Sequence, residues 1–97
     1  MPEYARMVSF DADDAALDAI LDEIGSSDGP PDGVPATRII VLANRSAGKV
    51  VVGVRFDSEE DLRAGGAALD AMSPPDVGTI RRTSVDEFEV LLERKLT

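Results

Sequence analysis

The chain has 97 residues, of which 43% are hydrophobic and 30% are charged, and this size and balance predict one globular domain over residues 1–97. Nineteen acidic against ten basic residues give a formal net charge of -9, which repels nucleic acid and anionic membrane surfaces. Because the chain has no Cys and no His, thiolate nucleophiles, sulfur-ligated metals and Ser-His-Asp triads are excluded.

The first predicted element is a strand over residues 4–10, where side chains alternate between two faces. Asp11 to Asp14 then offer capping oxygens and negative charge to the start of a helix. The apolar residues that follow have the spacing of one helix face: Leu17, Ile20, Leu21 and Ile24. Residues 25–36 contain three Gly and three Pro, and they predict a long connection.

A hairpin is predicted next. Residues 37–44 are nearly all apolar and indicate a strand with large side chains on both faces. The turn residues 44–48 follow, and residues 49–56 give the second strand.

A second helix is predicted to start at Ser58, because a hydroxyl cap is followed by a carboxylate at Asp61. Its apolar stripe holds Leu62, Leu69 and Met72, with Gly65 and Gly66 on the same stripe. The sequence Ser73, Pro74, Pro75 ends this helix, since proline cannot donate a backbone hydrogen bond.

The last predicted strand runs from about Arg82 to Lys95. Phe88, Val90 and Leu92 share one face, and Val85 is out of phase with them. This change of phase predicts a β-bulge near Asp86 and Glu87.

An internal repeat organises these elements. The segment from Val8 to Asp14 matches the segment from Val54 to Glu60 in pattern, and each is a strand end that runs into a helix cap. Two βαβ halves joined by a hairpin predict an α+β, ferredoxin-like βαββαβ fold, in which a four-stranded antiparallel sheet carries both helices on one face.

That arrangement leaves the other sheet face without cover, although the strands carry apolar residues for both faces: Ala5, Met7, Ile40, Leu42, Val51 and Leu91. At roughly 25 cal/mol per Å² of apolar surface, exposure of such a face would forfeit several kcal/mol. We therefore expect a homodimer in which two sheets pack face to face.

The segment Asn44 to Leu69 (NRSAGKVVVGVRFDSEEDLRAGGAAL) and the segment RRTSVDEFEV resemble the dimeric α/β-barrel, antibiotic-biosynthesis-monooxygenase-like superfamily, especially its small uncharacterised bacterial members. The resemblance implies the ferredoxin-like fold and the sheet-to-sheet dimer. Activities of that superfamily include cofactor-independent oxidation of aromatic polyketides and oxidative haem breakdown. The haem-degrading branch uses Asn, Trp and His; this chain has no Trp or His, and its only Asn is Asn44, so no catalytic residue carries over.

Gly65 and Gly66 are unusual inside a helix, where each costs about 0.8–1.0 kcal/mol relative to Ala. They indicate either close approach of the helix to the sheet or space for a ligand. The candidate ligand-binding residues are Tyr4, Arg6, Phe10, Arg55, Gly65, Gly66, Met72 and Phe88. Alternatively, the phenylalanines belong to the core, and Arg6 and Arg55 pair with Glu89 or another strand carboxylate.

The first functional hypothesis is a dimer that binds a small hydrophobic or aromatic ligand between helices and sheet. A cofactor-independent monooxygenase is an alternative, in which Arg6 or Arg55 holds an anionic oxygen of an aromatic substrate. A protein-interaction module that uses residues 25–36 is a second alternative. No catalytic residue and no cofactor are predicted. No metal site is predicted either, since the aspartates at residues 11–14 lack EF-hand spacing. Without a signal-like start or an apolar run of about 20 residues, a cytoplasmic location is expected.

Overall fold

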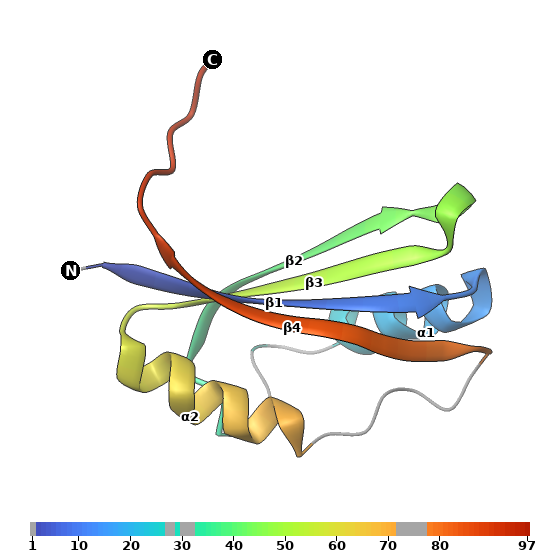
Figure 1. Ribbon diagram of the computed structural model, residues 1–97, viewed down its shortest axis with the longest axis horizontal. Coiled ribbons are helices and arrows are strands. Elements are labelled where there is room, and N and C mark those ends of the chain that lie inside the picture. The colour runs from blue at the N-terminus through green and yellow to red at the C-terminus, as the bar shows by residue number, and fades with distance from the viewer. Residues whose placement is uncertain (1, 27–28, 30–32, 72–77) are drawn as a thin grey trace.

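The computed structural model describes residues 2–26, 29, 33–71 and 78–97. The elements in chain order are β1 (Glu3–Ala12), α1 (Asp14–Gly25), β2 (Ala36–Asn44), the short 3-10 helix η1 (Arg45–Ala47), β3 (Lys49–Phe56), α2 (Glu59–Asp70) and β4 (Ile80–Val90). The strands form one antiparallel sheet in the order β2-β3-β1-β4. Both helices lie on one side of this sheet (Figure 1). The predicted ferredoxin-like fold is confirmed.

The two helices begin at side-chain caps, as the sequence predicts. Asp13 Oδ1 accepts a hydrogen bond from the Ala16 N–H at 2.9 Å, and Ser58 Oγ accepts one from the Asp61 N–H at 3.1 Å. Each cap follows directly on a strand that ends at the helix. The predicted end of the second helix at residues 73–75 lies outside the described residues, as do residues 27–28 and 30–32 of the predicted connection.

The hairpin between β2 and β3 is also confirmed, with Asn44 paired to Lys49 at its tip. Asn44 Oδ1 accepts a hydrogen bond from the Ala47 N–H at 3.3 Å. Gly48 closes the turn with φ of 66°, a left-handed conformation that glycine adopts without steric cost. Arg45 reaches Asp14 at 2.8 Å, which ties the hairpin tip to the start of α1.

The core has two parts, one under each helix. Under α1 the buried residues are Ala12, Ala16, Leu17 and Val50. Under α2 they are Val34, Val54, Phe56 and Leu62. Val52 packs against both groups. Because successive strand residues point to opposite faces, the residues between these core positions on β1 and β3 point to the side that neither helix covers.

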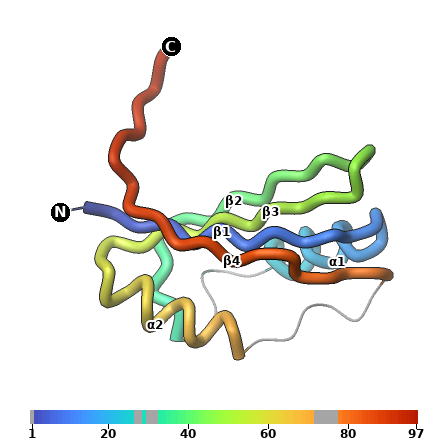
Figure 2. Tube along the Cα trace, in the orientation of Figure 1, coloured from blue at the N-terminus to red at the C-terminus, as the bar shows by residue number. Residues whose placement is uncertain are grey.

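The last strand differs from its prediction in two ways. It ends at Val90 rather than Lys95, and its register shifts where Ser9 pairs with Ser84 but Phe10 pairs with Arg82, so the irregularity is not at Asp86 and Glu87. Val85 and Phe88 lie on opposite faces, opposite Val8 and Ala5 respectively, and their difference in phase needs no bulge. Residues 91–97 leave the sheet on the side away from the helices (Figure 2).

Candidate functional site

The sheet face that the helices leave uncovered is called the open face here. The strand register places these residues on it: Ala5, Met7, Ser9, Arg38, Ile40, Leu42, Val51, Gly53, Arg55, Ser84, Asp86 and Phe88. Three of its large apolar side chains are about half exposed, with 53% for Ile40, 50% for Leu42 and 53% for Phe88. Of the apolar residues predicted for this face, Ala5, Met7, Ile40, Leu42 and Val51 lie on it. Leu91 does not, because β4 ends at Val90.

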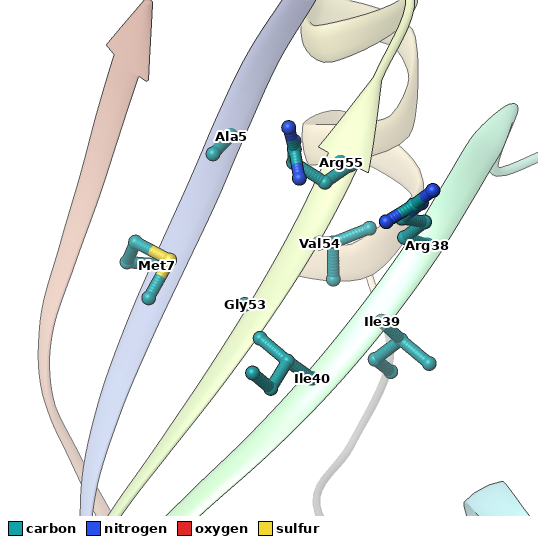
Figure 3. A pocket seen from close by; sticks show the side chains of 8 residues that line it. All are labelled: Ala5, Met7, Arg38, Ile39, Ile40, Gly53, Val54 and Arg55. Atoms are coloured by element: carbon teal, nitrogen blue, oxygen red, sulfur yellow. The ribbon is translucent and has the colours of Figure 1, made fainter. Parts of the chain in front are cut away.

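A hollow of about 270 Å³ lies on the open face, and its wall includes Ala5, Met7, Ile40 and Gly53. Figure 3 shows Met7 and Ile40 on either side of Gly53. A Cβ at Gly53 would stand 2.8 Å from Met7 Sδ and 2.9 Å from Ile40 Cγ2. The missing side chain therefore lets two apolar side chains come close to the Gly53 backbone from either side, and they form part of the wall of the hollow.

Two arginines line one end of the hollow, Arg55 from β3 and Arg38 from β2 (Figure 3). Arg55 pairs with Glu93, which follows β4, and lies 3.6 Å from Glu3. Arg38 lies 3.6 Å from the same Glu93. The Arg55 side chain is 18% exposed, and its buried Nε has no hydrogen-bond acceptor in the part of the chain that the structure describes. This end of the hollow therefore holds two arginines and two carboxylates, with Glu93 shared by both arginines and Glu3 near Arg55 alone.

The predicted ligand-binding residues do not all lie on one face. Tyr4, Arg6 and Phe10 belong to the helix side, since Arg6 pairs in register with Val54 of the core. Arg55 and Phe88 belong to the open face, because Ala5 lies opposite both of them. Met72 lies outside the described residues.

Gly65 and Gly66 bring α2 close to the sheet. A Cβ at Gly65 would lie 2.3 Å from Phe56 Cε1, and the Phe56 ring is completely buried. At Gly66 a Cβ would meet Arg6 Nε at 3.6 Å. The helix therefore rests directly on Phe56. Of the two interpretations of the glycines, close approach of the helix to the sheet fits this contact, which leaves no room for a ligand between Gly65 and Phe56.

Arg6 is buried beneath α2, and its guanidinium pairs with Asp70 at the end of that helix. The same carboxylate lies 3.0 Å from Arg82 Nη1 on β4. The partner of Arg6 is thus a carboxylate on a helix, not Glu89 or another strand carboxylate as the sequence suggests. A buried charge needs such a partner, so Arg6 serves to hold α2 on the sheet.

Tyr4 stands near the other end of α2, in a shallow depression shared with Glu59 and Glu89. Partial burial raises the pKa of the Tyr4 phenol, and the negative charges of Glu59 and Glu89 and a hydrogen bond with Glu89 raise it further. At neutral pH the phenol is therefore protonated and acts as a hydrogen-bond donor, not as a base.

Comparisons with known protein families, with curated proteins and with solved structures find no match to this chain. Among the described residues, no three side chains of the His, Cys, Asp or Glu type are grouped to hold a metal ion. Within the same residues, no helix is long and apolar enough to span a membrane. The open face and its hollow are therefore the features of the described residues that bear on function.

Sequence reasoning did not single out Gly53, Arg38 or Glu93 as candidate site residues. A signal for Gly53 was available, because a glycine inside a strand often marks close approach of other groups. Arg38 and Glu93 gave no such signal, since only the observed course of the chain after β4 brings them together with Arg55.

Proposed function

We propose that the protein is a homodimeric binding protein of the dimeric α/β-barrel type. In this proposal the open faces of two copies pack together, and the hollow over Gly53 holds a small hydrophobic or aromatic ligand between them. The observation that carries the proposal is the open face itself, where half-exposed Ile40, Leu42 and Phe88 lie beside an apolar hollow.

The physical support is the cost of leaving this face in water. Full burial of a Leu, Ile or Phe side chain contributes about 1.5–3 kcal/mol relative to full exposure, and these side chains obtain only about half of that burial within one chain. Arg38 and Arg55 stand at one end of the hollow, and Asp86 lies on β4, on the other side of β1 and opposite Met7. An apolar centre with charged residues around it is the usual composition of a protein interface.

The two alternative functions have less support. The sequence-based expectation places the ligand between helices and sheet for both the binding function and the monooxygenase, but at Gly65 the helix lies on Phe56. We therefore move the proposed ligand to the open face, and the monooxygenase lacks the enclosed space that it needs. The interaction-module hypothesis concerns residues 25–36, of which 27–28 and 30–32 lie outside the described residues.

Sedimentation of the full chain at about 10 µM tests the dimer, since stable interfaces have dissociation constants at or below the micromolar range. We expect a dimer for the natural sequence and a monomer for Ile40→Glu, because the substitution puts a charge into the centre of the interface. The matched control is Leu21→Glu, which changes a 42% exposed side chain on α1 and should leave the dimer intact. A monomeric natural protein, or equal effects of both substitutions, would contradict the proposal.

The binding function is tested separately by thermal shift. We expect stabilisation by at least one member of a panel of one-ring and two-ring aromatic compounds at about 1 mM, because a ligand that binds only the folded protein raises its melting temperature. No shift across the panel counts against the binding function and leaves the dimer to be judged by sedimentation.

A further inference from the structure

We propose that the ligand of the hollow is an anion, whose acidic group binds Arg55 and Arg38 in place of the Glu93 carboxylate. Binding would then release Glu93, and the segment of residues 91–97 that carries it, from the two arginines. This inference rests on the proposed binding function, and it adds the charge of the ligand and a segment of the chain that competes with it.

Arg55 is the first reason. It lies within the sheet, with Ala5 and Arg38 as its neighbours on the adjacent strands, and most of its side chain is buried. A guanidinium in that position needs an acceptor. A carboxylate can engage Nε and a terminal nitrogen of arginine together, in the two-pronged geometry that makes such pairs strong. Glu93 bonds to Nη1 of Arg55, and Glu3 lies 3.6 Å from Nη2. The buried Nε is left without an acceptor among the described residues.

The hollow supplies the second reason, because apolar side chains adjoin the two arginines. Ala5, Met7 and Ile40 form an apolar wall, and the volume of about 270 Å³ is just below the range of ligand sites, about 300–1,000 Å³. A flat compound of one or two rings with one acidic group fits both features. The rings would lie over Gly53, and the acidic group would face the arginines.

The third reason is that Glu93 belongs to a segment with little to hold it. It follows β4 on residues without regular structure, and Leu91, Leu92 and Leu96 are 84%, 81% and 87% exposed. Glu93 itself pairs with Arg55 and Arg38 at a half-exposed position. The Arg38–Glu93 pair is exposed on both sides, and on the Arg55–Glu93 pair the carboxylate is the exposed partner. Exposed ion pairs contribute little stability, so Glu93 is a counterion that a ligand can replace.

The test compares two probes of the same shape, 1-naphthoate and 1-naphthamide, by calorimetry on the full chain at pH 7. The natural protein should bind the anionic probe at least about tenfold more tightly than the neutral one, as a charge-assisted contact to arginine implies. Glu93→Gln should tighten naphthoate binding by about two- to fivefold, the range of an exposed ion pair, and should leave naphthamide binding unchanged. The exposed Arg38→Gln should reduce the preference for the anion.

Glu59→Gln is the matched control, because it breaks another exposed Arg–Glu pair, with Arg63 on α2, and should change neither affinity. Equal binding of the two probes by the natural protein would overturn the anion inference and leave the binding function intact. An unchanged naphthoate affinity in Glu93→Gln would overturn the displacement of Glu93. If neither probe binds, the inference fails together with the binding function on which it rests.

Release of the segment can be measured directly. The chain has no Cys, so Leu92→Cys carries a single fluorescent label beside Glu93. Its anisotropy should fall when naphthoate is added and stay constant with naphthamide, because only the anion competes for the arginines. Constant anisotropy at saturating naphthoate would show that Glu93 stays in place, against the proposal.

Discussion

Gly65 and Gly66 are neighbours in sequence, yet their surroundings in α2 differ. Gly65 faces the buried ring of Phe56, and Gly66 faces the Arg6 side chain at ordinary contact distance. Each glycine lowers the stability of the helix by a similar amount relative to Ala. Only at Gly65 does the absence of a side chain make room for the sheet.

Gly65→Ala should therefore destabilise the fold, by about 1–3 kcal/mol as expected for overpacking, because the new methyl group would overlap a ring that cannot move into solvent. Gly66→Ala is the control. It should be neutral or stabilise by up to about 1 kcal/mol through helix propensity. Urea denaturation of both variants at one protein concentration checks the difference. Similar stability of the two would mean that the Phe56 ring can shift aside.

At this scale the sequence predicts where an anomaly lies but not what it faces. The sequence marks the two glycines as unusual, but the choice between close approach and ligand space depends on the position of Phe56 on the sheet beneath the helix. Arg6 and Arg55 likewise share a residue type and lie on adjacent strands. They point to opposite faces because Arg6 lies opposite Val54 and Arg55 opposite Ala5, a register that only strand pairing fixes.

Among the elements, α1 and β4 are joined by the cap of the helix. Asp13 accepts hydrogen bonds from the Ala16 N–H and from the Thr79 N–H, both at 2.9 Å. Both hydrogen bonds hold the pKa of the Asp13 carboxyl below its ordinary value, and the one from Ala16 has the larger effect. The charged form of Asp13 thus stabilises both the start of the helix and the entry to the last strand.

Asp13→Asn should lower the melting temperature at pH 7, because the neutral amide loses the charge that these N–H groups favour. Since the folded pKa lies below the unfolded one, the contribution of the charge is complete above the unfolded value, near 4, and is lost as pH falls through the folded pKa. The difference between variant and natural protein should therefore shrink in melts below about pH 4. Asp22→Asn, on an exposed position of the same helix, should differ little from the natural protein at either pH. A difference in melting temperature that does not change with pH would mean that Asp13 stabilises the helix by hydrogen bonding alone, without a contribution from its charge.

The boundaries of β4 show why element ends are hard to predict. Apolar residues continue past Val90 as Leu91 and Leu92, and alternation alone extends the strand to Lys95. In the structure Val90 pairs with Glu3, the first residue of β1, so the residues after Val90 have no strand beside them. A strand ends where its partner ends, and the sequence of β4 does not contain that information.

For the whole molecule, the repeated pattern of strand end and helix cap carried most of the prediction. Phe10 lies two residues before the end of β1, and Phe56 ends β3. Asp13 and Ser58 cap the helices that follow these strands. Signals of this kind can be read from the sequence because capping and alternation depend on residues that are close together in the chain. The hollow depends instead on side chains from three strands and on the course of residues 91–97, so it could not be read from any one segment.

The net charge of -9 per chain gives the proposed dimer a characteristic response to salt. Two copies repel one another at long range, whereas the open face contributes apolar contact that salt does not screen. The screening length falls from about 30 Å at 0.01 M salt to about 8 Å at 0.15 M, so added salt should remove repulsion before it affects contacts within the interface. We therefore expect the dimer dissociation constant to decrease several-fold between 0.01 and 0.15 M NaCl, as measured by sedimentation equilibrium. A dimer that weakens over this range would be held mainly by ion pairs, and its interface would then centre on charged residues such as Arg38 and Asp86 instead of Ile40 and Leu42.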